Sequence, residues 1–218
     1  MQHSTIHVLF INIVIFNHIM NKKQLVESLK KQKFPEKIID AFRKVKREDF
    51  IPKNLKNLAY EDNALQLEEG ATISQPYTIA FMLSLLELKE NQKILEIGSG
   101  SGYVLALILK ITKKGEIYGI EIIKSLAEKS QSLFLKDRKI TVLNKDGSNG
   151  LLESAPFDRI LISAASNNIP YHLTNQLKYE GIIVAPVKNS IFQIKKYGDK
   201  ITTNEYEGFI FVPLQHEK

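Results

Sequence analysis

The stretch Lys93–Tyr103, with the sequence KILEIGSGSGY, most constrains what this chain can fold into. A short apolar run containing Glu96 ends in a glycine-rich turn, and apolar residues at helical spacing begin immediately afterwards. This order predicts a strand, a tight loop and a helix, the unit that places backbone N–H groups and a helix N-terminus beside a nucleotide-like ligand. Glycine is required there because the chain turns sharply and a side chain would block the approach of the ligand.

The glycine spacing narrows the class of ligand. A dinucleotide fingerprint has its third glycine three positions after its second, whereas here Gly102 follows Gly100 by two positions. An acidic residue before a G-x-G-x-G turn is instead typical of S-adenosylmethionine (SAM) methyltransferases. A second strand, residues 116–120, is followed by Glu121, about 20 residues further on, where a carboxylate can accept hydrogen bonds from both ribose hydroxyls. An ordinary turn followed by an acidic helix start is the simpler alternative.

Strand-like and helix-like segments alternate after the glycine turn, which predicts an α/β fold. We expect a helix through Leu173 and Leu177, followed by a buried strand at residues 181–187. Two further strands, residues 191–194 and 209–212, are expected to pair antiparallel. The sequence therefore predicts a Rossmann-like class I SAM-dependent methyltransferase with a mainly parallel, doubly wound sheet, a C-terminal antiparallel strand pair and an N-terminal helical cap.

The chain is expected to divide into an N-terminal segment, a cap and a core. Residues 1–20 carry an apolar run interrupted by histidine and asparagine, without the cationic start and cleavage site of a signal peptide. We interpret residues 1–20 as an extension outside the core. We further hypothesise that residues 1–19 result from a start codon chosen too far upstream of Met20, and an intact mass that includes Met1 or Gln2 would contradict this hypothesis. Residues 21–218 are expected to form one methyltransferase domain, with the helical cap over 21–70 and the Rossmann-like core over 71–218.

Composition excludes some kinds of site. The chain has no cysteine and only five histidines, so disulfides and thiolate metal sites are excluded and no metal is expected. The 30 Lys and Arg residues outnumber the 24 Asp and Glu residues, which raises the possibility of a nucleic-acid partner. Because lysines are mostly interleaved with acidic residues, as in residues 44–49, we interpret them as a solvated surface and expect neither a nucleic-acid nor a membrane partner.

A serine lies upstream of the glycine turn, in the segment Thr72–Tyr77 that leads into an apolar helix. Ser74 stands where an N-cap belongs and Pro76 falls in the first turn, so Ser74 as a simple helix cap is one interpretation. The other is that its hydroxyl meets an anionic substrate, because free N–H groups and the helix dipole favour a carboxylate at a helix N-terminus.

Two later segments follow strands at the edge where open α/β sheets bind ligands. Asp146 and Gly147 come after the strand at residues 140–143, and Asp146 is a candidate acceptor for the adenine amino group, with a plain turn as the alternative. The small-residue loop 164–170 follows the strand at residues 158–163 and allows a substrate backbone to approach closely.

Together these segments resemble the protein-L-isoaspartate O-methyltransferase family. The matching segments are RED-FIP at 47–52, YEDNAL at 60–65, TISQPY at 72–77, LEIGSGSGY at 95–103, Asp146-Gly147, APFD at 155–158, Ala164-Ala165, Ile169-Pro170 and FVPL at 211–214. The SAM turn alone is generic, whereas the TISQPY and FVPL segments are specific to this family. The chain departs from the family pattern at Lys145, where glycine is common, at residues 166–168, and at Glu180, where the family has glycine.

The resemblance implies methyl transfer from SAM to the free α-carboxylate of L-isoaspartyl residues in damaged proteins and peptides. The products are S-adenosyl-L-homocysteine and a methyl ester that cyclises to a succinimide, which returns partly to aspartate. Ser74 is implied as the catalytic residue. The implied cofactor-binding residues are Thr72, Ile73, Glu96, Ile97, Gly98, Ser99, Gly100, Gly102, Glu121, Asp146 and Gly147. The implied substrate-binding residues are Ser74, Gln75, Pro76, Ala164, Ala165, Ile169, Pro170 and Val212. We expect a cytoplasmic, monomeric enzyme.

The nearest alternative is a tRNA adenine N1-methyltransferase, which also combines an Ile-x-Gln-Pro-Tyr-like element with a G-x-G-x-G loop. The basic charge balance favours it slightly, and the FVPL segment argues against it. A salt-sensitive affinity for tRNA would support it, because phosphate contacts give a steep dependence on salt. A non-enzymatic SAM-binding module is a third interpretation, against which stands the presence of Ser74, Glu121 and Asp146.

Overall fold

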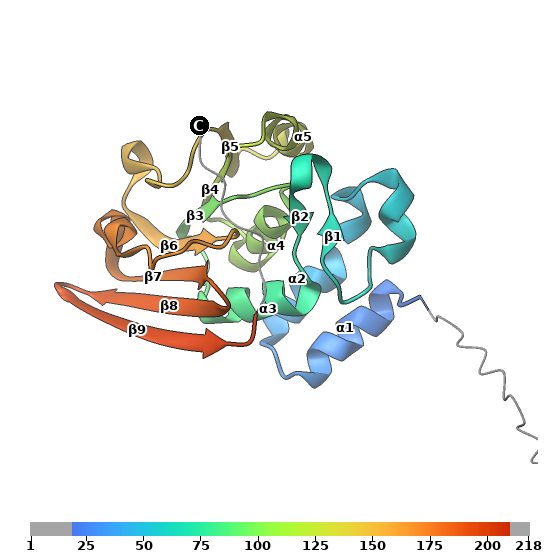
Figure 1. Cartoon of the computed structure of the whole chain (residues 1–218), viewed down its shortest axis with the longest axis horizontal. Helices are drawn as coiled ribbons and strands as arrows, with labels where there is room; N and C mark the ends of the chain where they lie inside the picture. Colours follow the sequence, from blue (N-terminus) through green and yellow to red (C-terminus); the bar gives the residue numbers. More distant parts are fainter. Residues whose placement is uncertain (1–18, 210–218) are drawn as a thin grey trace, which may run out of the picture.

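A seven-stranded sheet organises the computed structural model, which describes residues 19–209 of the chain. The strands are β3 (Lys93–Ile97), β4 (Glu116–Glu121), β5 (Ile140–Asn144), β6 (Phe157–Ile162), β7 (Leu177–Val187), β8 (Ser190–Tyr197) and β9 (Lys200–Glu207). Their order in space is β5-β4-β3-β6-β7-β8-β9 (Figure 1). β3 to β7 pair in parallel, whereas β8 and β9 are antiparallel additions at one edge. The predicted sheet with its C-terminal antiparallel pair is therefore confirmed.

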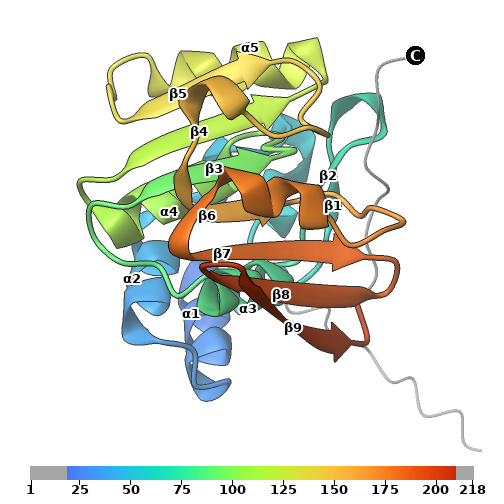
Figure 2. The same cartoon turned by 90° about the vertical axis from the view of Figure 1, so that its left-hand side faces the viewer.

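Helices cover the two faces of the sheet unequally. The α-helices are α1 (Lys22–Lys31), α2 (Glu36–Lys44), α3 (Pro76–Leu85), α4 (Tyr103–Thr112) and α5 (Lys124–Phe134). Figure 2 shows α1 to α4 behind the sheet, with two short 3-10 segments, η4 (Leu152–Ser154) and η5 (Tyr171–Gln176), in front of it. α5 packs beside the start of α4, where a Cβ added to Gly102 would collide with Ser130 and Phe134.

Alternating side chains along the strands produce two hydrophobic cores, one on each face of the sheet. On β3, Ile94 joins the core that the α-helices cover. Its neighbour Leu95 and the next residue on that face, Ile97, join the second core, which Leu173 of η5 helps to close. All four side chains are almost completely buried, so removing their apolar surface from water stabilises both layers.

The expected N-terminal helices are present as α1 and α2. α1 begins with a capping box, in which Asn21 accepts from the Gln24 N–H and the Gln24 side chain accepts from the Asn21 N–H. α2 packs against α4, and the rings of Phe42 and Tyr103 meet edge to face at 6.2 Å between centroids. Two 3-10 segments follow, η1 (Arg47–Asp49) and η2 (Lys53–Leu58). Most of the expected N-terminal extension lies outside the described residues, and the division into cap and core stays a prediction.

A short hairpin, which we call the strap, joins the cap to α3. It consists of β1 (Leu65–Gln66), the 3-10 turn η3 (Glu68–Gly70) and β2 (Thr72–Ile73), with the two strands antiparallel. Figure 1 shows its turn next to α5. Two side-chain contacts fix it there: Ser125 donates to Glu69 at 2.8 Å, and Lys129 forms an ion pair with Glu68.

Two expected elements differ from the structure. The helix expected through Leu173 and Leu177 is wrong: η5 ends at Gln176, and Leu177 already belongs to β7, where it pairs with Phe157 and enters the second core. The pairing expected for the strand at residues 191–194 with residues 209–212 is also wrong. The partner of β8 is β9, which pairs with it along its whole length, and Phe209 lies beyond it. Residues 210–212 lie outside the described part of the chain.

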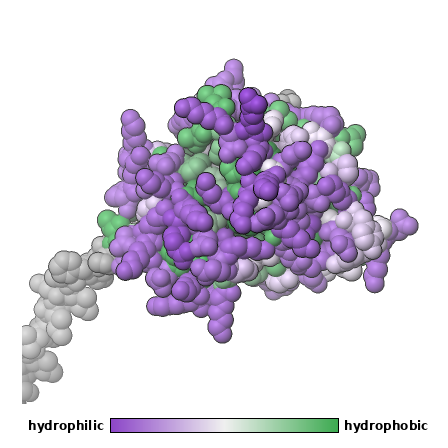
Figure 3. Space-filling view, turned by 180° about the vertical axis from the view of Figure 1, so that it is seen from behind, coloured by the Kyte–Doolittle hydropathy of each residue, from purple (hydrophilic) through white to green (hydrophobic). Residues whose placement is uncertain are grey.

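Residues 19–209 contain no helix that is long and apolar enough to cross a membrane. Within the same range there is no group of three or more His, Asp or Glu side chains arranged to hold a metal ion. Figure 3 views the molecule from the side opposite to Figure 1 and shows a predominantly hydrophilic surface with small, scattered hydrophobic areas. Large apolar patches, which mark many interaction sites, are not seen on this face.

Candidate active site

A pocket lies where the strap, the start of α3 and the glycine turn after β3 meet. Its empty volume is about 490 Å³, including the part open to solvent. It brings together seven predicted site residues, which are Thr72, Ile73, Ser74, Glu96, Gly98, Ser99 and Gly100. The other lining residues, for which no ligand contact was predicted, are Leu67, Ile79, Met82, Ser101, Tyr103, Val104, Leu161 and Ser163. We call this cavity the glycine pocket.

The glycine turn uses its own N–H groups inside the protein. The N–H groups of Gly98 and Ser99 donate to the Ile120 carbonyl at 2.8 and 3.0 Å, and the Gly100 N–H donates to Glu121 Oε2 at 2.7 Å. By contrast, within residues 19–209 the carbonyls of Gly98 and Gly100 accept no hydrogen bond. The N–H groups at these three positions are therefore not free to bind a ligand. The turn offers acceptors, which suit a positively charged ligand group.

Glu96 adds a carboxylate to the glycine pocket. Its side chain is 1% exposed, and Oε1 accepts from the Ser163 hydroxyl at 2.6 Å. Oε2 has no hydrogen-bond partner in the described part of the chain. Burial raises the pKa of Glu96 to about 8; the Ser163 hydrogen bond opposes this shift and the charge of Glu121 adds to it. A buried carboxylate oxygen without a partner is costly unless a ligand satisfies it.

Glu121 lies at the carboxyl end of β4, as its position in the sequence predicted. Its oxygens accept from the N–H groups of Gly100 at 2.7 Å and Ile123 at 2.9 Å, which fix the carboxylate beside the glycine turn. Each oxygen retains a lone pair for a further donor. Asp146 follows the neighbouring strand β5, and its Oδ1 accepts from the Ser148 N–H at 2.7 Å.

These groups fit SAM. Positive sulfonium and ammonium groups match the free carbonyls of the turn and the unpartnered oxygen of Glu96. Ribose hydroxyls match the remaining lone pairs of Glu121. The residues present therefore supply acceptors where this cofactor has donors and positive charge.

Ser74 is partly exposed and lines the glycine pocket. Its predicted role as an N-cap is wrong, because α3 begins at Pro76 and the N-cap residue is Gln75. Asp62 does the capping instead: its carboxylate accepts from the Tyr77 N–H at 2.8 Å and from the Gln75 side chain at 3.2 Å. The hydroxyl of Ser74 makes no hydrogen bond within residues 19–209 and is available to a ligand.

The other predicted residues are distributed around a second cavity and beyond it. This cavity has an empty volume of about 1120 Å³, including open solvent, and is lined by Ile97, Gly147, Ala165, Ile169 and Pro170 among others. Ala164 lies at its edge, next to Gly98 of the glycine turn.

Among the described residues, the predicted site residues that line neither cavity are Gln75, Pro76, Gly102, Glu121, Asp146 and Ala164. Pro76 is buried at the start of α3, and the Gln75 side chain contacts Asp62. Gly102 allows α4 to pack against α5. Val212 lies outside the described part of the chain. The ligand contacts expected for all of these residues stay predictions.

Sequence reasoning missed two residues that shape the glycine pocket. Asp62 lies in the segment that resembles the family at residues 60–65, but the pattern gave no sign of its contact with a helix that begins far along the chain. Ser163 directly follows β6, and only the pairing of β6 with β3 brings it to Glu96.

Comparison with known proteins identifies the family. The model for protein-L-isoaspartate(D-aspartate) O-methyltransferases matches residues 20–218. The chain belongs to this family. A protein-L-isoaspartate O-methyltransferase of Petrotoga mobilis is 44% identical over 187 residues, which cover 82% of this chain and 87% of that protein. A protein-L-isoaspartate O-methyltransferase of Dictyoglomus thermophilum is 40% identical over 203 residues, which cover 90% of this chain and 91% of that protein.

Solved structures agree with the fold. A protein-L-isoaspartate O-methyltransferase structure superposes with a TM-score of 0.80 at 25% identity, covering 90% of this chain and 66% of that one. A structure from Plasmodium falciparum, assigned as a protein-L-isoaspartate O-methyltransferase and in complex with S-adenosyl-L-homocysteine, superposes with a TM-score of 0.78 at 23% identity, covering 90% and 99%. The second similarity is evidence of a shared fold.

Proposed function

We propose that this enzyme transfers the methyl group of SAM to the free α-carboxylate of L-isoaspartyl residues in damaged proteins and peptides. The observation that carries the proposal is the glycine pocket, which Ser74 and the unpartnered oxygen of Glu96 line together, in a chain of the protein-L-isoaspartate O-methyltransferase family. Glu96 supports a positively charged methyl donor. Ser74, with a free hydroxyl beside the start of a helix, supports a negatively charged acceptor.

The main contribution of the protein to this reaction is to position the methyl donor and the acceptor carboxylate relative to each other. When bound, SAM supplies a methyl group on a sulfonium that is already a good leaving group. The acceptor carboxylate is ionised at neutral pH, so no strong base is needed. The Ser74 hydroxyl donates a hydrogen bond that orients this carboxylate, while Glu96 and the Gly98 carbonyl face the positive end of the donor. Holding the reactants in line contributes several kcal/mol to the lowering of the barrier.

The remaining residue assignments are part of the proposal. Glu121 accepts hydrogen bonds from the ribose, and Asp146 accepts one from the adenine amino group. Thr72 and Ile73 of the strap cover the cofactor, because both line the glycine pocket. The loop 164–170 and Val212 contact the substrate backbone.

A direct assay tests this function. Labelled SAM is incubated with the full chain and either a synthetic L-isoaspartyl peptide or its normal aspartyl twin, and a third reaction contains tRNA. We expect base-labile label in the isoaspartyl peptide alone. Label in tRNA, together with an affinity that falls steeply with salt, would instead support the tRNA adenine N1-methyltransferase alternative.

We also propose that the enzyme acts as a cytoplasmic monomer. The chain contains no cysteine, which suits a reducing compartment, and the surface in Figure 3 carries only small hydrophobic areas. Sedimentation velocity of the full chain tests the oligomeric state. A species of twice the monomer mass at micromolar concentration would contradict the proposal.

A further inference from the structure

Arg47 is the largest of the side chains that are fully buried in the described part of the chain, with 0% of its surface exposed. Its guanidinium donates hydrogen bonds to four main-chain carbonyls. Nη1 reaches Ala59 and Glu61 at 3.2 Å each, and Nη2 reaches Asn63 and Ser74 at 3.1 Å each. One buried cation therefore joins the segment 59–63 directly to the backbone of Ser74.

The same segment also holds the start of α3, which follows Ser74 in the chain. Asp62 lies between two of the residues whose carbonyls Arg47 binds, and its carboxylate accepts from the Tyr77 N–H and the Gln75 side chain. Ser74 is thus held on its C-terminal side by two contacts, one to its own carbonyl and one to the capped start of α3, while β2 ends at Ile73 directly before it. We call Arg47 and Asp62, with these contacts, the serine frame.

The Ser74 side chain depends on this frame for its direction. Its hydroxyl makes no hydrogen bond within residues 19–209, and Ser74 lies between β2 and α3 rather than in either element. Backbone position therefore decides where the Ser74 Cβ lies and which directions its hydroxyl can reach in its staggered rotamers. A planar guanidinium fixes several acceptors at once more rigidly than an ammonium does. In Arg47 the two terminal nitrogens bind the four carbonyls, whereas Nε has no hydrogen-bond partner in the described part of the chain.

We propose that Arg47 is a positioning residue for methyl transfer, which aims the Ser74 hydroxyl at the acceptor carboxylate without touching either substrate. The proposal rests on the function proposed above. The competing explanation is that Arg47 simply stabilises the cap, as any buried arginine whose terminal nitrogens bind main-chain carbonyls would.

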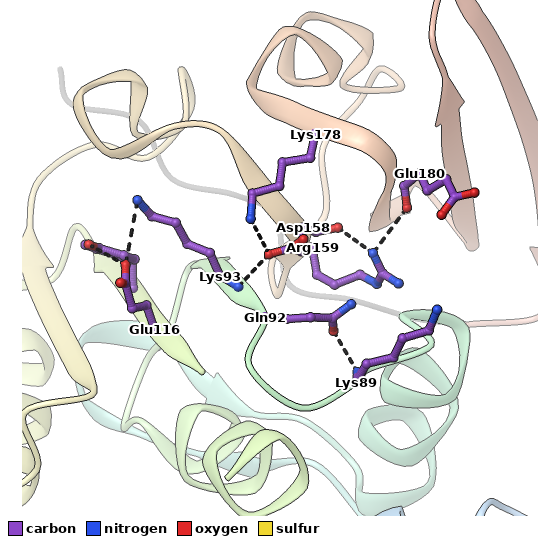
Figure 4. A network of polar contacts seen from close by, with 9 residues as sticks. Lys89, Gln92, Lys93, Glu116, Asp158, Arg159, Lys178 and Glu180 are labelled. Atoms are coloured by element: carbon purple, nitrogen blue, oxygen red, sulfur yellow. Dashed lines mark hydrogen bonds and ion pairs between the residues drawn. The ribbon is translucent and has the colours of Figure 1, made fainter. Parts of the chain in front are cut away.

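Arg159 is a matched control for that explanation. It is 5% exposed, and its guanidinium also donates to four main-chain carbonyls, those of Leu86, Glu87, Asp158 and Glu180. Figure 4 shows two of these contacts, those of Arg159 with Asp158 and Glu180. None of these residues lines the glycine pocket. A variant of Arg159 therefore reports the loss of a buried arginine alone.

The test compares Arg47→Met with Arg159→Met in the full chain. Both variants are expected to unfold at a lower temperature than the unsubstituted protein. Only Arg47→Met is expected to lower kcat for the isoaspartyl peptide, by about 100-fold, because misplacement of a reacting group by about 1 Å costs this much. The affinity for S-adenosyl-L-homocysteine should change by less than about three-fold, since Ser74 does not hold the cofactor.

A conservative variant adds a second readout. Arg47→Lys keeps the charge but loses the planar fork, so an intermediate kcat is expected. Equal kcat values for the Arg47→Met and Arg159→Met enzymes would overturn the proposal and leave a structural role for Arg47. If Arg47→Met does not fold, Asp62→Ala replaces it, because this substitution removes the other part of the frame at a partly exposed position.

Hydrogen–deuterium exchange tests the frame without any substrate. Amides of residues 74–79 should exchange faster in Asp62→Ala and in the folded Arg47 variants than in Arg159→Met, and unchanged exchange there would also overturn the proposal. An unsubstituted enzyme that leaves the isoaspartyl peptide unmodified would count against the proposed function, while the exchange result still decides whether the frame exists.

Discussion

At the residue scale, two side chains of the glycine pocket differ in what their surroundings demand of them. Glu96 is buried, half satisfied by Ser163, and its pKa is raised to about 8 by burial. Ser74 is partly exposed and its hydroxyl is free of contacts within residues 19–209. Glu96 therefore has a buried oxygen that lacks a hydrogen-bond partner within residues 19–209 and that a ligand can satisfy. The Ser74 hydroxyl needs only the correct orientation toward the acceptor carboxylate.

Removal of the Ser74 hydroxyl tests its role. Ser74→Ala is expected to lower the methylation rate by about 10- to 100-fold, because a hydrogen bond to a charged group contributes about 1.5–3 kcal/mol. Affinity for SAM should stay nearly unchanged. Rates come from the isoaspartyl peptide assay and affinities from calorimetry. Ser84→Ala is the control, since that hydroxyl only bonds the Phe81 carbonyl within α3. Equal losses of rate and SAM affinity would contradict the prediction.

The raised pKa of Glu96 predicts a coupling between protons and cofactor. With a pKa of about 8, Glu96 is mostly protonated at pH 7 in the free protein. A positive ligand group favours the ionised form and lowers this pKa, so SAM binding should release a proton at pH 7 and strengthen as pH rises towards 8.

Calorimetry in two buffers of different ionisation enthalpy measures this proton release. Glu96→Gln should abolish it and flatten the dependence of SAM affinity on pH, because the amide does not titrate. Proton uptake by the unsubstituted protein at pH 7, or a pH profile that the substitution leaves intact, would show that Glu96 does not face the positive group.

At the element scale, the strap decides how the glycine pocket is enclosed. Leu67, Thr72 and Ile73 line the pocket from above the turn, and a Cβ added to Gly100 would lie 4.0 Å from Leu67 Cδ1. The strap is held at its far end by contacts of Glu68 and Glu69 with α5. A cofactor under the strap therefore leaves more easily when these contacts are released.

Loosening the strap should accelerate cofactor release. The double variant Glu68→Gln, Glu69→Gln is expected to increase the dissociation rate of S-adenosyl-L-homocysteine about two- to five-fold, in keeping with the small free energy of exposed ion pairs. Displacement of labelled ligand gives the rate. Glu90→Gln is the control, because it breaks the exposed Glu90–Lys113 pair away from the pocket. Identical dissociation rates for the two proteins would rule out the strap as the barrier.

At the scale of the whole molecule, the two edges of the parallel strands have separate roles. The carboxyl ends of β3, β4 and β6 surround the candidate site, whereas a polar network closes the opposite edge (Figure 4). There, Asp158 Oδ2 accepts from the Lys93 N–H at 2.7 Å and from Lys178 Nζ at 2.8 Å, and Arg159 binds the carbonyls described above. We expect changes at this edge to affect stability rather than chemistry.

Arg159→Met should lower the free energy of unfolding by about 2–4 kcal/mol. Each main-chain carbonyl left unsatisfied in the interior costs about 1–3 kcal/mol, and water hydrogen-bonds to some of the four carbonyls in the variant. Denaturant titration of the full chain measures this. Arg43→Met is the control: Arg43 pairs with Glu36 and Asp40 on the surface, and its loss should cost less than about 1 kcal/mol. Similar losses of unfolding free energy in the two variants would mean that the hydrogen bonds of Arg159 do not stabilise the fold.

Local patterns in the sequence determined the glycine turn, the positions of Glu96 and Glu121 and the succession of the parallel strands along the chain. These features depend on residues close together in the chain, where alternation, glycine conformation and strand length leave few options. β9 escaped prediction because its residues Lys200–Glu207 carry little apolar alternation; pairing with β8 defines it.

Only the tertiary structure decided which groups surround Ser74. Arg47 reaches the Ser74 carbonyl from 27 residues away in the chain. Asp62 binds the neighbouring residues Gln75 and Tyr77, and Ser163 reaches Glu96 through the pairing of β3 with β6. No periodic pattern marks such contacts, because a buried polar group takes whichever partner the packed elements bring within hydrogen-bond distance. The sequence alone thus determined the kind of site, and long-range packing decided how its residues are held and paired.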